Sequence, residues 1–135
     1  MSSHQAPEYL TFDEVIRLHT LAMAAEGLPP FPLRDLGLLE SALQRPQNAA
    51  SYGDADLVAQ AVLLTQAIAQ AQAFIDGNKR TALAAFDVFL QVNGLDCDGD
   101  ANELAVRIEA VAAPGHDERA AAVAELERWV RDHTR

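Results

Sequence analysis

The chain has 135 residues, enough for one compact domain but too few for two, so we expect a single domain over 1–135 with an N-terminal tail over 1–9. Half of the residues are apolar, 22% are charged, and no apolar run reaches the roughly 18 residues of a membrane span, which excludes disordered and membrane-spanning classes. With 20 acidic and 10 basic residues the net charge is −10, and a nucleic-acid backbone would repel such a chain.

The first expected helix begins at a capping box. Thr11 and Glu14 are the N-cap and third-position residues of that motif, and apolar residues at helical spacing then predict a helix over 12–26. Residues 27–32 contain three prolines, which fix the backbone and remove amide donors. The helix is therefore expected to end in a proline-rich loop.

A short second helix is expected to follow. Leucines at helical spacing mark it: Leu36, Leu39 and Leu43. Pro46 should end this helix, because proline lacks an amide donor and crowds the preceding turn. Residues 46–55 are then left for a loop that could carry a short flap hairpin, with Asp54 or Asp56 as the N-cap of the next helix.

The third and fourth expected helices are the most apolar. From Leu57 the apolar residues recur at steps of three and four, which predicts a helix that leads to Ala73. The next segment, 78–93, has apolar residues around most of its circumference, so this helix should be central and buried. Asn93 and Gly94 give it a typical left-handed C-terminal stop.

Two further helices complete the expected fold. Asp100 and Glu103 open a fifth helix that ends before Pro114, and a last helix is expected over 117–132. The sequence contains no repeat, no low-complexity tract and no convincing pair of strands. The expected architecture is therefore all-α, with about six helices in one compact domain.

The lack of a membrane-spanning run and of an N-terminal signal pattern leads us to expect a cytoplasmic protein without a membrane partner. Cys97 is the single cysteine and cannot form an internal disulfide, and the N-terminus lacks a signal pattern. The excess of acidic residues has two interpretations that the sequence leaves open. It either keeps the protein soluble or forms a docking face for a basic partner segment.

Chemically active residues crowd into the segment between the third and fourth helices. A carboxylate, a glycine, an amide and two cations occupy the five positions 76–80 beside a helix start. The amides and dipole of a helix N-terminus attract anions, and Gly77 lets the backbone approach a bound group closely. With Lys79 and Arg80 alongside, phosphate is the expected ligand. Asp76 would repel it unless a hard cation such as Mg²⁺ lay between them, so the segment indicates a Mg²⁺-nucleotide.

The same residues also have a purely structural interpretation. Asp76 or Asn78 would be the N-cap of a helix, Gly77 its turn residue, and Lys79 and Arg80 solvated cations. Composition alone leaves both interpretations open.

The segment resembles the motif of the Fic family, which reads His-x-Phe-x-Asp/Glu-Gly-Asn-Gly/Lys-Arg between two helices. The agreement holds at every position from Phe74 to Arg80, and Asn-Lys-Arg-Thr over 78–81 is similar to the death-on-curing (Doc) branch of that family. The resemblance covers roughly residues 8–130 and implies a Fic/Doc-like helical domain. Weaker similarity lies in Leu18-His19, in Asp35 with 38–43 and Pro46, in Phe89-Leu90 and in Asn93-Gly94.

The resemblance implies a role for each residue of the segment. Asp76 would help to hold Mg²⁺, and Phe74 would anchor the loop in the core. The implied cofactors are ATP and Mg²⁺. The remaining residues, with nearby backbone amides, would position the phosphates of the nucleotide: Gly77, Asn78, Lys79 and Arg80.

The resemblance also implies a reaction and partners. Fic proteins at large transfer AMP to a protein hydroxyl, whereas the Doc branch includes a kinase that phosphorylates elongation factor Tu, so the implied protein is the transferase toxin of a toxin–antitoxin pair. Some Fic proteins restrain themselves with a helix that carries Ser or Thr, three residues, then Glu and Gly or Asn. Glu26 and Gly27 come nearest here, but Ala22 occupies the hydroxyl position. A separate antitoxin polypeptide is therefore the expected partner.

Gln72 stands where the Fic family has its histidine, the group that takes the proton from the target hydroxyl. A carboxamide can orient a hydroxyl but cannot remove its proton, and general-base catalysis is typically worth about 10²–10⁴-fold. We therefore expect impaired chemistry with nucleotide binding retained. His19 is interpreted as a packing or hydrogen-bonding residue. It is one of four histidines that lie outside the motif, with His4, His116 and His133.

Three explanations of Gln72 stay open: an engineered substitution, a natural pseudoenzyme, or a natural variant with a different base. The second would make the chain a non-catalytic Fic-like module that binds a nucleotide or a protein partner. A helical structural protein with an incidental capped loop is a further alternative, and it predicts no nucleotide binding.

Overall fold

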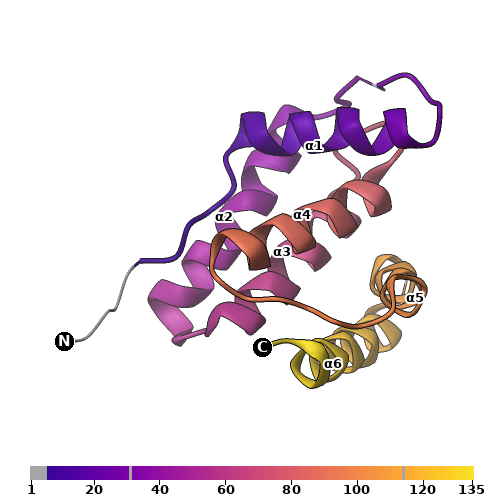
Figure 1. Cartoon of the computed structure of the whole chain (residues 1–135). Helices are drawn as coiled ribbons and strands as arrows, with labels where there is room; N and C mark the ends of the chain where they lie inside the picture. The colour runs from indigo at the N-terminus through magenta and orange to yellow at the C-terminus, as the bar shows by residue number, and fades with distance from the viewer. Residues whose placement is uncertain (1–5, 31, 114) are drawn as a thin grey trace.

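The computed structural model describes residues 6–30, 32–113 and 115–135, and over these residues it consists of six α-helices joined by loops (Figure 1). The helices are α1 (Phe12–Ala25), α2 (Leu36–Gly53), α3 (Leu57–Ala71), α4 (Asn78–Val92), α5 (Ala101–Ala112) and α6 (His116–His133). Within these ranges there is no strand, and extended segments meet in isolated bridges between Leu33 and Phe74 and between Cys97 and Thr134. The expected all-α architecture with about six helices is confirmed.

Two sequence-based expectations fall partly outside the described residues. The expected N-terminal tail over 1–9 includes residues 1–5, which are not described, and residues 6–11 run without helix to the start of α1. α5 ends at Ala112, which agrees with an end before Pro114, although Pro114 itself is not described.

Side-chain caps start α1, α2, α3 and α5. The hydroxyl oxygen of Thr11 accepts a hydrogen bond from the Glu14 N–H, and the Glu14 carboxylate accepts one from the Thr11 N–H, so the predicted capping box is present. Aspartates cap the other three of these helices: Asp35, Asp56 and Asp100. The N-cap of α4 is Gly77, and no side chain in the described part of the chain caps this helix; α6, which follows Gly115, is likewise without a side-chain cap. The first-turn amides of α4 therefore lack the side-chain partner that α1, α2, α3 and α5 have.

α2 is longer than the sequence predicted, because it continues through Pro46 to Gly53. The expected loop and flap hairpin over 46–55 are therefore wrong, since helix occupies most of these positions. A proline inside a helix costs about 3 kcal/mol in lost hydrogen bonding and crowding. Pro46 is buried here, and α2 packs along α3, so tertiary packing offsets that local cost. Asp54 ends α2 in the left-handed conformation, and Asp56 caps α3.

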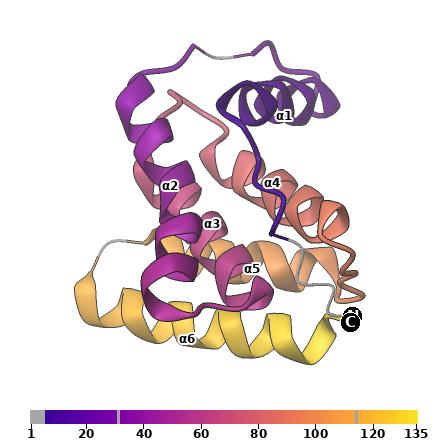
Figure 2. The ribbon, with the colours of Figure 1, turned by 90° about the vertical axis from the view of Figure 1, so that its left-hand side faces the viewer.

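α3 and α4 form the centre of the molecule, as Figures 1 and 2 show with α1 above them and α5 and α6 below. The predicted burial of the fourth helix is confirmed, since Phe86, Phe89 and Leu90 of α4 are buried in the core. α1 packs on α4, α2 packs on α3, and the α5–α6 pair packs on the other side of α3. The connection between α3 and α4 therefore joins two helices that are each packed against several other helices.

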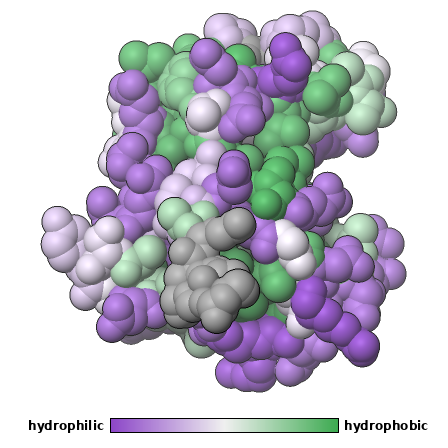
Figure 3. Space-filling view, turned by 60° about the vertical axis from the view of Figure 1, so that its left-hand side comes forward, coloured by the Kyte–Doolittle hydropathy of each residue, from purple (hydrophilic) through white to green (hydrophobic). Residues whose placement is uncertain are grey.

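Hydrophilic residues form most of the lower edge of the face drawn in Figure 3, where α6 lies, and hydrophobic residues gather higher up. Several large apolar side chains are exposed, among them Leu21 of α1, Leu36 of α2 and Ile75 of the α3–α4 connection. None of the helices in the described ranges combines the length and the apolar character that crossing a bilayer requires.

Candidate functional site

The 72–77 loop joins α3 to α4 and has a left-handed residue at each end. Gln72, the residue after α3, has φ 55° and ψ 38°, and Gly77, the residue before α4, has φ 84°. A Cβ atom at position 77 would lie 2.5 Å from Met23 Sδ and 3.1 Å from His19 Nε2. Both the backbone conformation and the neighbours in α1 therefore require glycine at position 77.

Asn78 holds the 72–77 loop together from within. Its side-chain oxygen accepts a hydrogen bond from the Phe74 N–H at 3.0 Å, and its side-chain nitrogen donates to the Phe74 carbonyl at 2.9 Å. Asn78 and Phe74 are both buried, and the Phe74 ring stacks on His19 with ring centroids 3.9 Å apart. Since the loop uses the carboxamide of Asn78, the backbone N–H is what this residue can offer to a ligand.

Two side chains from elsewhere in the chain also bind this loop. The Nε2–H of His19 donates to the carbonyl of Asp76 at 2.9 Å, which agrees with the packing and hydrogen-bonding role expected for this histidine. Nη2 of Arg34 donates to the carbonyl of Gln72 at 2.6 Å. The sequence did not identify Arg34, because nothing in its own neighbourhood relates it to a residue 38 positions later.

A cavity of about 520 Å³ lies between the 72–77 loop, the start of α4 and α5. Phe74 lies in the core instead of lining this cavity. The cavity brings together most of the residues that the sequence singled out: Gln72, Asp76, Gly77, Asn78, Lys79 and Arg80. The sequence did not identify the rest of its lining: Ile75, Leu83, Ala105, Ile108 and Glu109.

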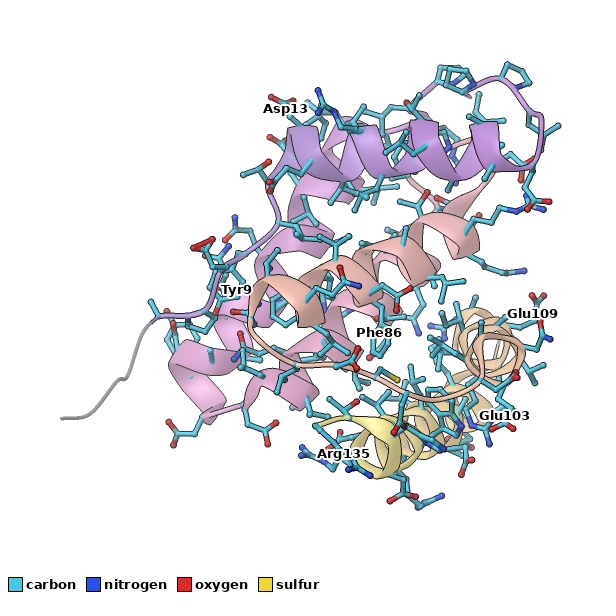
Figure 4. All side chains as sticks on the ribbon, viewed as in Figure 1. Tyr9, Asp13, Phe86, Glu103, Glu109 and Arg135 are labelled. Carbon is cyan, nitrogen blue, oxygen red and sulfur yellow. The ribbon has the colours of Figure 1, made fainter. Side chains whose placement is uncertain are left out.

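Both cations of the cavity are paired with carboxylates from other elements. Nζ of Lys79 lies 2.8 Å from Oε1 of Glu109, which Figure 4 shows on the upper side of α5, toward α4. Nη2 of Arg80 lies 3.5 Å from Oε1 of Glu26, the C-cap of α1. All four side chains are about half exposed, so these ion pairs are weak and an incoming anion can replace them.

Asp76 is the carboxylate of the loop itself. Its Oδ1 accepts a hydrogen bond from the Gly77 N–H at 2.7 Å, and its side chain is exposed at the cavity. In the described ranges no three His, Cys, Asp or Glu side chains gather closely enough to hold a metal ion. One exposed carboxylate suits Mg²⁺, which proteins commonly bind through one or two carboxylates together with phosphate and water.

Comparison with known families identifies the family of this all-α chain. The family model of the Fic/DOC family matches residues 9–90, and the chain belongs to this family. A protein of Mycolicibacterium smegmatis called Toxin Doc is 42% identical over 96 residues, which is 69% of this chain and 70% of that protein. The family match covers α1 to most of α4 with the 72–77 loop, and it ends before α5 begins.

Proposed function

We propose that this protein is a Doc-type toxin, a nucleotide-dependent transferase that moves a phosphoryl or AMP group from Mg²⁺-ATP to a protein hydroxyl. The observation that carries the proposal is the start of α4, where a helix without a side-chain cap opens into a cavity beside Lys79 and Arg80. The cavity volume of about 520 Å³ suits a small-molecule ligand. The family and the relative called Toxin Doc support the interpretation as a toxin.

The first turn of α4 would hold the phosphates. The backbone N–H groups of residues 78–80 belong to that turn, and the positive end of the helix dipole adds to their attraction for anions. Lys79 and Arg80 would exchange their pairing with Glu109 and Glu26 for phosphate oxygens. Gly77 allows the left-handed turn that begins α4 to pack closely on Met23 and His19 of α1.

Asp76 would hold the divalent cation at the beginning of the same turn. Mg²⁺ supplies charge neutralisation and orientation of the phosphates when it is bound. The Gly77 N–H bonds one oxygen of the Asp76 carboxylate and so fixes its direction. The carboxylate would thereby be oriented before the ligand arrives.

Gln72 limits the chemical step in this proposal. Its side chain lines the cavity, and its Nε2 donates a hydrogen bond to the Ala69 carbonyl at 3.3 Å. The carboxamide can accept a hydrogen bond from a hydroxyl but cannot take its proton. If the family histidine acts as the general base here, the rate with glutamine is lower by about 10²–10⁴-fold.

A non-catalytic Fic-like module is the second candidate. The observation that favours it is the combination of Gln72 with the other motif residues around one cavity: Asp76, Gly77, Asn78, Lys79 and Arg80. Such a module would bind a nucleotide or a protein partner without transferring a group. The partners in the leading proposal are an antitoxin polypeptide and a target such as elongation factor Tu, in the cytoplasm.

Calorimetry with ATP and Mg²⁺ on the full chain tests nucleotide binding. Wild type should bind, and Arg80→Ala should weaken binding by about tenfold or more, since a charge-assisted contact to phosphate is lost. Arg45→Ala removes an exposed arginine of α2 as the matched control and should bind as wild type does. Absence of binding by wild type would reject the transferase proposal and the nucleotide-binding form of the second candidate, and would leave a module that binds a protein partner.

Transfer of radiolabel from ATP separates the two candidates. Gln72→His should give label transfer to a bacterial lysate protein or growth arrest on expression, and co-expression with the antitoxin should relieve the arrest. A variant that binds ATP as tightly as wild type but transfers no label would favour the non-catalytic module instead.

A further inference from the structure

The Gln72 end of the loop is held by the segment that leads into α2. Nη2 of Arg34 donates to the Gln72 carbonyl at 2.6 Å, and the backbone N–H groups of Arg34 and Asp35 donate to the Ala73 carbonyl at 2.6 and 3.2 Å. Leu33 forms a bridge with Phe74. Among these contacts, the guanidinium of Arg34 is the side chain that reaches residue 72.

Residue 72 needs such a contact because its backbone is unfavourable for glutamine. A residue with a Cβ atom crowds its own carbonyl in the left-handed region, and such conformations persist where surrounding contacts hold them. The Gln72 carbonyl lies at the C-terminal end of α3, where the helix dipole is negative. A cationic donor at this position therefore satisfies the carbonyl and complements the dipole.

The Asp76 end of the loop is held separately, from α1. His19 is buried, donates to the Asp76 carbonyl at 2.9 Å and stacks on Phe74. A Cβ atom placed at Gly77 would lie 3.1 Å from the same ring, so His19 also packs directly beneath the turn that begins α4.

Neither Arg34 nor His19 lines the cavity, and they contact different carbonyls from different elements. We propose that both are positioning residues, each for one end of the loop. Arg34 orients residue 72 toward the reacting hydroxyl, and His19 holds the turn that presents Asp76 to the divalent cation and the α4 amides to the phosphates. This division of roles rests on the proposed function. Loss of Arg34 should then impair the chemical step, and loss of His19 should impair nucleotide binding.

Amide hydrogen exchange on the full chain, without any ligand, tests whether Arg34 holds the Gln72 end of the loop. Arg34→Ala should speed exchange at Ile75, whose N–H bonds the Pro32 carbonyl, by about tenfold, with little change at Gly77. Arg34→Lys, which keeps one cationic donor, should restore most of the protection. Arg45→Ala is the control. Equal exchange in wild type and Arg34→Ala would overturn the role of Arg34.

The effects of Arg34 and His19 on group transfer and on ATP binding are measured in the Gln72→His variant with ATP and Mg²⁺. Adding Arg34→Ala should lower the rate of label transfer by about tenfold or more while the dissociation constant for ATP stays within about twofold. Adding His19→Gln should weaken ATP binding by about fivefold or more. Equal loss of affinity in both variants would overturn the division of roles.

The possible failures can be told apart. If wild type does not bind ATP, the proposed function fails, whereas hydrogen exchange still decides whether Arg34 holds residue 72. If the His19→Gln variant does not fold, as thermal unfolding would reveal, His19→Asn provides the same comparison with a smaller amide side chain. Unchanged ATP affinity in a folded His19 variant would overturn the role of His19.

Discussion

The ammonium group of Lys79 and the carboxylate of Glu109 lie 2.8 Å apart and join the start of α4 to α5 across the cavity. Glu109 is thus paired with Lys79, the cation that a phosphate would bind in the proposed function. Together with Asp76 and Glu26 it gives three carboxylates against the two cations Lys79 and Arg80. An anion must therefore compete with an internal carboxylate before it reaches the first turn of α4.

Glu109→Gln should strengthen the binding of inorganic pyrophosphate by about two- to fivefold, the range that corresponds to an exposed ion pair of about 0.4–1 kcal/mol. Calorimetry at low and at high salt measures this, and the gain should shrink at high salt because screening weakens exposed ion pairs. Glu127→Gln, which alters an ion pair on α6, is the matched control. Weaker pyrophosphate binding by Glu109→Gln would mean that Glu109 assists the ligand.

Asn78→Ala should destabilise the fold by about 2–4 kcal/mol. The substitution leaves the N–H and the carbonyl of Phe74 without their partner in a buried position, and each unsatisfied buried group costs about 1–3 kcal/mol. Urea unfolding measures the change, with Asn102→Ala on the exposed side of α5 as the control. A loss below about 0.5 kcal/mol would contradict the structural role assigned to this carboxamide.

Gly77→Ala and Gly53→Ala should change stability in opposite directions. Alanine at position 77 would have φ 84° and a Cβ within 2.5 Å of Met23 Sδ, so we expect a loss of about 2 kcal/mol or more. Gly53 ends α2, and a Cβ atom there would have no neighbouring atom within 4 Å, so alanine should be neutral or stabilise by up to about 1 kcal/mol. Thermal unfolding of the two variants gives the comparison directly.

Stability should fall at acid pH partly through Asp56. Arg131 of α6 donates to both carboxylate oxygens of Asp56 at 3.0 and 3.1 Å, and this bonding, with the Ala59 N–H, lowers the pKa of Asp56 below its ordinary value. A lowered folded-state pKa stabilises the fold above the unfolded pKa of about 4, and this stability is lost as pH falls through the folded pKa. Because the pair is exposed, its contribution is below about 1 kcal/mol.

Urea unfolding at pH 7 and at pH 3 measures that contribution. Asp56→Asn keeps a side chain that can cap α3 but removes the charge, so its loss of stability between the two pH values should be smaller than that of wild type. Asp132→Asn removes an exposed carboxylate of α6 and should leave the wild-type acid loss unchanged. Equal losses in wild type and Asp56→Asn would contradict the pairing with Arg131.

Local chemistry explains what the sequence predicted correctly. A hydroxyl or carboxylate at an N-cap bonds amides two or three residues away, so Thr11 and Asp100 marked their helices without any knowledge of the fold. For α3 the sequence offered Asp54 or Asp56, and Asp56 is the cap. Residues 76–80 could be recognised as a candidate ligand-binding segment for the same reason, because they are consecutive in the sequence and lie at a helix start, which is itself a local feature.

Tertiary packing decided what the sequence did not predict. Pro46 disfavours a helix locally, but α2 lies along α3 and buries the proline ring, so the helix runs to Gly53. The α5 wall of the cavity, with Glu109, and the contact of Arg34 with residue 72 join positions 30 or more residues apart. No local pattern contains that information.

The left-handed backbone at Gln72 also bears on which side chains position 72 can accept. Histidine, asparagine and aspartate adopt this conformation more readily than most residues, whereas β-branched side chains are outliers there. A mutant library at position 72 should therefore lose valine, isoleucine and threonine through misfolding before any selection for activity. Histidine at position 72 should keep the same backbone conformation. A change of one codon would therefore convert the glutamine form into one that carries an imidazole at the cavity.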